Sequence, residues 1–120
     1  MAGTLQVYSY NRCSTCRKAL SWLKENGLDH VVIDISTSPP SRPLLEAAVA
    51  QFGERRPLFN TSGQSYRELG AAAVKAMNDD EALDALAADG RLIKRPFVVT
   101  PEGRVLVGFK PEVWEDQLKG

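Results

Sequence analysis

Residues 5–16 indicate the architecture of this chain more strongly than any other segment. They read Leu5-Gln6-Val7-Tyr8-Ser9-Tyr10-Asn11-Arg12-Cys13-Ser14-Thr15-Cys16. The apolar start predicts a buried strand over residues 5–9, and the polar residues 11–14 predict a turn. Apolar residues then recur at helical spacing and predict a helix that runs to about Asn26, with Gly27 as its stop. A second strand over residues 30–35 completes a β-α-β unit whose crossover is long enough for parallel pairing.

The rest of the chain divides into a helical segment and a return to strands. Helices are predicted from Ser41 to Gly53, over residues 65–69, and from Asn78 or Asp79 to Gly90. Strand-like runs follow at residues 92–93, 97–100 and 104–109, and Pro111 opens a last helix. Near-continuous apolar runs favour strands buried on both faces of a sheet.

This order of elements is the thioredoxin-like pattern, an α/β fold with a mixed central sheet, interrupted by a helical insert. We expect one domain over residues 1–120, with thioredoxin-like parts at about 1–40 and 91–120 and the insert at about 41–90.

Composition excludes several classes of function. Fifteen basic residues balance fifteen acidic ones, which gives no electrostatic reason to expect direct binding of nucleic acid or a membrane surface. The N-terminal residues do not resemble a signal peptide, and no apolar run approaches the length of a membrane span, so we expect a cytoplasmic protein. With two cysteines and His30 as the only histidine, the chain has too few ligands for a structural zinc site, and we predict no metal.

The two cysteines carry the clearest chemical signal. A Cys-x-x-Cys pair between a strand and a helix is where a thiol–disulfide enzyme places its thiols, and the helix start favours a thiolate. Arg12 and Arg17 are near in sequence and could add positive charge. Cys13 precedes the first turn, so we predict that it is the exposed nucleophile and that Cys16 is the resolving thiol. The alternative is a pair of buried, inert cysteines.

A second set of residues could bind an anion beside the thiols. Arg95-Pro96 is a candidate cis peptide, although only about 5–6% of X-Pro bonds in folded proteins are cis. In thioredoxin-like proteins a cis-proline faces the active-site cysteines, so Arg95 is predicted to project toward Cys13; the alternative is a solvated surface arginine. Asn60 and Thr61 begin a polar loop that either completes an anion site or forms a turn before the next helix. The predicted anion-binding residues are Arg12, Asn60, Thr61, Arg95 and Pro96.

Four segments carry a family resemblance: residues 8–19, 59–69, 92–96 and 107–109. Through them the chain resembles the ArsC/Spx (arsenate reductase-related) family over essentially its whole length. The resemblance implies a thioredoxin-like domain with a helical insert. The family's glutaredoxin-coupled arsenate reductases use one cysteine, which matches Cys13, and three arginines that hold the oxyanion. One arginine matches Arg95, whereas the other two would fall at Asn60 and near Gly108. Those enzymes also typically lack a cysteine where this chain has Cys16.

The resemblance is therefore closer to the Cys-x-x-Cys members of the family. Its Spx/MgsR branch contains redox-sensing regulators that bind the α subunit of RNA polymerase. Three hypotheses follow for this chain. The first is a thiol–disulfide oxidoreductase with no bound cofactor, reduced by glutathione, glutaredoxin or thioredoxin as a transient partner. The second is an arsenate reductase coupled to the same reductants, and the third is a redox-sensing regulator that binds RNA polymerase.

Overall fold

The computed structural model describes residues 3–119 and contains two compact units. The sheet unit combines residues 3–33 with residues 95–119, and the helical unit comprises Asp34–Lys94. Within the described residues, no helix is both long and apolar enough to cross a membrane. Nor do any three or more histidine, cysteine or acidic side chains of residues 3–119 form a group that could hold a metal ion.

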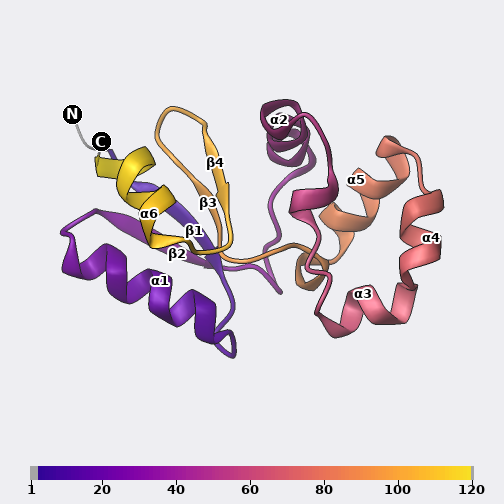
Figure 1. Cartoon of the computed structure of the whole chain (residues 1–120), viewed down its shortest axis with the longest axis horizontal. Coiled ribbons are helices and arrows are strands. Elements are labelled where there is room, and N and C mark those ends of the chain that lie inside the picture. Colours follow the sequence, from indigo (N-terminus) through magenta and orange to yellow (C-terminus); the bar gives the residue numbers. More distant parts are fainter. Residues whose placement is uncertain (1–2, 120) are drawn as a thin grey trace. The chain divides into compact units, whose positions relative to one another are not determined.

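The sheet unit contains four strands in the order β2-β1-β3-β4. Strand β1 pairs with β3 in antiparallel register, and β3 pairs with β4 in the same sense. Helix α1 crosses over from β1 to its neighbour β2, so the predicted α/β fold with a mixed central sheet is confirmed (Figure 1). The strands and helices of this unit are β1 (Leu5–Ser9), α1 (Ser14–Glu25), β2 (His30–Asp34), β3 (Phe97–Val99), β4 (Val105–Val107) and α6 (Pro111–Trp114).

One face of the sheet forms the core of this unit. Val7, Val98 and Leu106 lie opposite one another across β1, β3 and β4 and share a single buried cluster. Leu23 of α1 and Trp114 of α6 belong to the same cluster, so both helices cover this face. Burial of apolar side chains of this size contributes about 1.5–3 kcal/mol each, which is what fixes α1, and with it the cysteine pair, against β1.

Strand β2 differs from the expectation that the strands are buried on both faces. It lies at the edge of the sheet, and its Val31 and Val32 side chains are 48% and 56% exposed. Sequence hydrophobicity does not distinguish a central strand from an edge strand, so this part of the prediction was wrong.

The helical unit is built around α2 and α5. Leu45 and Ala48 of α2 and Ala82 and Leu86 of α5 are fully buried, and the two helices contact each other. Its helices are α2 (Arg42–Phe52), η1 (Arg56–Leu58), α3 (Gln64–Leu69), α4 (Ala71–Ala76), α5 (Asp79–Ala88) and η2 (Gly90–Leu92). Helix α4 was not predicted, because its small alanines show no clear apolar periodicity.

The predicted strand at residues 92–93 is absent. Residues 90–92 form a 3-10 turn, and Ile93 makes only an isolated antiparallel bridge with Phe59. The turn brings Gly90 so close to the backbone of Ile35 that a Cβ at position 90 would lie 1.7 Å from the Ile35 carbonyl oxygen. The predicted helical stop at Gly90 is therefore also a site of close backbone approach.

The start of α5 provides a test of local stability. The Asn78 side chain accepts the Glu81 N–H and the Glu81 carboxylate accepts the Asn78 N–H, which forms a capping box. The substitution Asn78→Ala should lower the free energy of unfolding by about 1 kcal/mol, measured by urea denaturation. The matched control is Ser41→Ala, because Ser41 caps α2 without a side-chain hydrogen bond and should change stability by only a few tenths of a kcal/mol. Equal effects of the two substitutions would contradict this account.

Candidate active site

Cys13 occupies the N-cap position of α1. A turn in which the Cys13 N–H donates to the Tyr10 carbonyl (3.0 Å) ends the extended path of β1, and the helix begins at Ser14. The Cys13 sulfur accepts the backbone N–H of Cys16 at 3.2 Å, in the place where a serine or aspartate oxygen commonly caps a helix. The predicted position of the pair between strand and helix is confirmed.

The two thiols differ in access to solvent. Both are free; Cys13 is partly exposed, whereas the side chain of Cys16 is fully buried. An external substrate can therefore reach Cys13 but not Cys16 in this state. The roles of nucleophile and resolving thiol stay predictions, and this difference in exposure agrees with them.

The surroundings lower the pKa of Cys13 below that of an ordinary cysteine. Partial burial alone would raise the pKa, but several hydrogen bonds to sulfur outweigh it. These come from the Cys16 thiol, the Cys16 N–H and the Arg95 guanidinium, whose positive charge also attracts the thiolate. Cys13 is therefore ionised to a greater extent at neutral pH than a free cysteine.

Cys16 shows the opposite shift. Its pKa is raised to about 11, chiefly by burial and also by the hydrogen bond and charge of the neighbouring Cys13, whereas hydrogen bonds from Tyr10 and Ser9 lower it. Of the two sulfurs, Cys13 therefore ionises more readily, and Cys16 stays a neutral thiol at neutral pH. This arrangement suits thiol–disulfide exchange, in which a thiolate attacks first and a protonated thiol reacts second.

Arg95 is the cation at the thiol. The Arg95–Pro96 peptide bond is cis, as predicted, and the guanidinium carbon lies 4.8 Å from the centre of the Tyr10 ring. Among residues 3–119, Arg95 Nε has no hydrogen-bond partner although it is buried, so part of the guanidinium is held by the ring face rather than by an acceptor. The Pro96 carbonyl accepts the Gly108 N–H at 3.0 Å.

Sequence reasoning did not identify Tyr10 as part of the site. The register that places Tyr8 opposite Phe97 carries Tyr10 and Arg95 to the same end of the β1–β3 pair. An aromatic residue at the end of a strand, three positions before the nucleophile, was the available signal. It becomes meaningful only when the pairing of β1 with β3 is known.

The arginines nearest in sequence do not act as expected on the thiol. Arg17 donates to the Asn11 carbonyl at 2.9 Å, and Arg12 is exposed; neither contributes to the shift in the pKa of Cys13. The activating charge comes instead from Arg95, far away in the chain. An anion-binding role of Arg12 stays a prediction.

Asn60 and Thr61 belong to the helical unit. The Asn60 N–H donates to the Leu92 carbonyl, its own carbonyl accepts the Gly63 N–H, and its side-chain oxygen accepts the Ser62 hydroxyl at 3.4 Å. These bonds describe a turn, the second of the two expected structures; an additional anion-binding role of either residue stays a prediction. Gly108 is buried and has a φ of 70°, a conformation that disfavours any larger side chain there.

Comparison with known proteins places these features in a family. A model described as "ArsC family" matches residues 8–117. The chain is 44% identical to the protein YusI of Bacillus subtilis over 94% of this chain and 97% of that protein. It is 36% identical to an arsenate reductase of Rhizobium meliloti over 83% of this chain and 71% of that enzyme. An ArsC family related protein from Bacteroides fragilis has a similar solved structure, with a TM-score of 0.86 and 41% identity over 97% of this chain and 98% of that one.

The contribution of Arg95 to the Cys13 thiolate is testable. The substitution Arg95→Gln removes the charge, so the pKa of Cys13 should rise, and alkylation by iodoacetamide at neutral pH should slow by about three- to tenfold. The matched control is Arg12→Gln, which removes an exposed arginine that does not shift the pKa of Cys13 and should leave the alkylation rate unchanged. The measurement is the alkylation rate as a function of pH, and a profile left unchanged by Arg95→Gln would exclude this account.

Tyr10 is expected to position Arg95 through its ring. Replacement by leucine removes the ring face, which is worth about 0.5–2 kcal/mol to the cation, and should move the alkylation profile toward higher pH by less than Arg95→Gln does. Tyr10→Phe keeps the ring, so its alkylation profile should match that of the wild type. If Tyr10→Phe and Tyr10→Leu shift the profile equally, the hydroxyl rather than the ring is responsible.

Proposed function

This chain belongs to the ArsC family, and from that premise we propose that it is a thiol–disulfide oxidoreductase in which Cys13 attacks and Cys16 resolves. The observation that carries the proposal is the opposite behaviour of the two thiols. Cys13 is accessible and has a lowered pKa, whereas Cys16 is buried and has a raised one. Two inert cysteines would not require this asymmetry.

The reaction needs two sulfur transfers. The Cys13 thiolate attacks one sulfur of a substrate disulfide, a mixed disulfide forms, and the other substrate sulfur leaves as a thiolate that takes up a proton. Cys16 then loses its proton and attacks the Cys13 sulfur, which releases the second substrate thiol and leaves a Cys13–Cys16 disulfide. The substrate gains two electrons and two protons; the protein supplies both electrons and the proton of Cys16, and the second proton comes from solvent.

The local structure supports this order of events. Burial and the neighbouring Cys13 thiol both raise the pKa of Cys16 in the reduced protein. Once Cys13 is bonded to a substrate sulfur it no longer carries the negative charge that opposes ionisation of Cys16. The second attack is thereby favoured after the first has occurred. A thiol reductant of the glutathione, glutaredoxin or thioredoxin class then returns the pair to the dithiol.

A second candidate function is arsenate reduction, favoured by relatives that carry this name and by the cation beside the thiol. Here the Cys13 thiolate attacks the arsenic of arsenate with loss of one oxygen as water. A second thiol, Cys16 or glutathione, attacks the Cys13 sulfur, so arsenite and a disulfide are the products. Arsenate turnover with glutathione and glutaredoxin or thioredoxin, abolished by Cys13→Ser, would establish this function. No turnover at millimolar arsenate would exclude it.

The oxidoreductase proposal predicts a specific pattern of products with glutathione disulfide. The wild-type protein should form the Cys13–Cys16 disulfide, seen by mass spectrometry as the loss of two hydrogen atoms. Cys16→Ser should stop at a glutathione adduct on Cys13, because the first attack remains and the second is removed. Cys13→Ser should remain unmodified, since Cys16 is fully buried and burial, the largest cause of its raised pKa, remains in this variant. An adduct on Cys16 in that variant, or two free thiols in the oxidised wild type, would contradict the assigned roles.

A further inference from the structure

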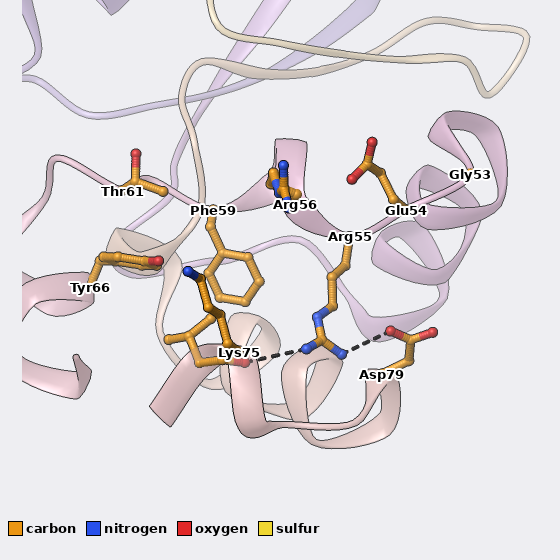
Figure 2. Close-up of a pocket in the computed structure, with 10 residues that line it drawn as sticks. Gly53, Glu54, Arg55, Arg56, Phe59, Thr61, Tyr66, Lys75 and Asp79 are labelled. Carbon is orange, nitrogen blue, oxygen red and sulfur yellow. Dashed lines mark hydrogen bonds and ion pairs between the residues drawn. The ribbon is translucent and has the colours of Figure 1, made fainter. Parts of the chain in front are cut away.

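The helical unit contains a pocket that the thiol chemistry does not use. Its volume is about 470 Å³, within the range of roughly 300–1,000 Å³ typical of small-molecule sites. All the residues that line it belong to the helical unit, between Gly53 and Asp79 (Figure 2). The pocket is therefore defined without reference to the sheet unit or to Cys13.

One part of the lining is aromatic and apolar. The Phe59 ring is buried, and the half-buried Tyr66 ring meets it edge to face, with 6.1 Å between the ring centres and 66° between the planes. The buried Val74 also lines the pocket. Aromatic rings in this arrangement offer a face and an edge against which a further planar ring can pack. The Tyr66 hydroxyl adds a polar group that can donate or accept a hydrogen bond.

The Arg55 guanidinium is engaged in hydrogen bonds within the wall of the pocket. It donates to the Asp79 carboxylate at 2.9 Å (Figure 2). It also donates to the carbonyls of Val74 and Met77, which ties the end of α4 to the start of α5. The charges of Arg55 and Asp79 thus satisfy each other. Neither is left to bind a ligand strongly.

Two further cations in the lining are unpaired. The side chains of Arg56 and Lys75 have neither a hydrogen-bond nor an ion-pair partner among residues 3–119. Once the Arg55–Asp79 pair is set aside, Glu54 is the remaining carboxylate of the lining, so the pocket presents an excess of positive charge. Figure 2 shows the Lys75 side chain together with the Phe59 and Tyr66 rings among the residues that line the pocket, so the lining contains both a cation and an aromatic surface.

We propose that this pocket binds a small organic anion that has a planar ring and carries a carboxylate or phosphate group. The ring packs on Phe59, Tyr66 and Val74, and the anionic group accepts hydrogen bonds from Lys75 and Arg56. Charge-assisted hydrogen bonds of this kind are stronger than neutral ones, so the negative charge of the ligand should dominate its selection.

The probes are 2-naphthoate and 4-nitrophenyl phosphate, with neutral 2-naphthamide as the comparison. Each is titrated into the full chain, and binding is followed by the backbone amide shifts of Phe59, Tyr66 and Val74 in nuclear magnetic resonance spectra. At least one anion should bind saturably with a dissociation constant of about 1 mM or below, and 2-naphthamide should bind about tenfold more weakly.

Variants separate this pocket from general surface binding. Lys75→Met keeps most of the apolar stem and removes the charge, so it should weaken binding of the anions by about five- to tenfold. Lys75 is exposed, and the variant is expected to fold. The matched control, Lys24→Met, removes an exposed lysine of α1 and should leave binding unchanged.

Three outcomes would overturn the proposal. The first is that neither anion binds at about 10 mM, which would leave no affinity for the ligand class. The second is that the shifts map to residues outside the lining. The third is any sign that the cations play no part, seen either as equal effects of Lys75→Met and Lys24→Met or as equal affinities for 2-naphthamide and 2-naphthoate.

Discussion

The antiparallel register between β1 and β3 is the constraint on which the candidate active site depends. Val7 lies opposite Val98 and Tyr8 opposite Phe97, so the same alignment carries Tyr10 and Arg95 to one end of the strand pair. Cys13 follows Tyr10 by a single hydrogen-bonded turn. A shift of one residue would exchange the buried and opposite faces of β1, so the packing of the core also holds the register of the site. The electrostatics of the thiol are therefore fixed by the hydrophobic core.

Within this frame, two sulfurs in neighbouring turns of one helix acquire different properties. Cys13, at the N-cap, receives hydrogen bonds and the charge of Arg95, and together these outweigh its partial burial. Cys16 lies one turn inward against the sheet, where burial dominates and raises its pKa to about 11. The helix geometry thus separates an accessible thiol with a lowered pKa from a buried thiol with a raised pKa. The lowered pKa of Cys13 depends on a few contacts, and Arg95 is the partner that lies farthest from Cys13 in the sequence.

The sequence alone predicted the elements that have strong local signals and missed those set by tertiary contacts. Strand β1, the crossover helix and a helix start at Asn78 or Asp79 were predicted, because apolar spacing, glycine and a capping side chain are local patterns; the structure places the cap at Asn78. The sequence offered Arg12, Arg17 and Arg95 as sources of positive charge at Cys13; of these three, Arg95 is the one that lowers the pKa of Cys13. Tyr10 was missed, because its position beside Arg95 follows from the pairing of β1 with β3 and not from neighbours along the chain. Residues 92–93 have strand-like composition, but the approach of Gly90 to Ile35 requires a tight turn beside them.

The number of cations at the thiol bears on which substrate the site suits. A tetrahedral oxyanion with two negative charges needs several charge-assisted contacts, each worth about 1.5–3 kcal/mol. Arg95 is one such cation, whereas the two further positions at which the family resemblance would lead one to expect arginines hold Asn60 and Gly108. A disulfide carries no charge at the sulfur that is attacked, and it needs only that the thiolate be stabilised and the resolving thiol be close. One arginine at Cys13 and a protonated Cys16 beside it meet that simpler requirement, which is why the oxidoreductase proposal stands ahead of arsenate reduction.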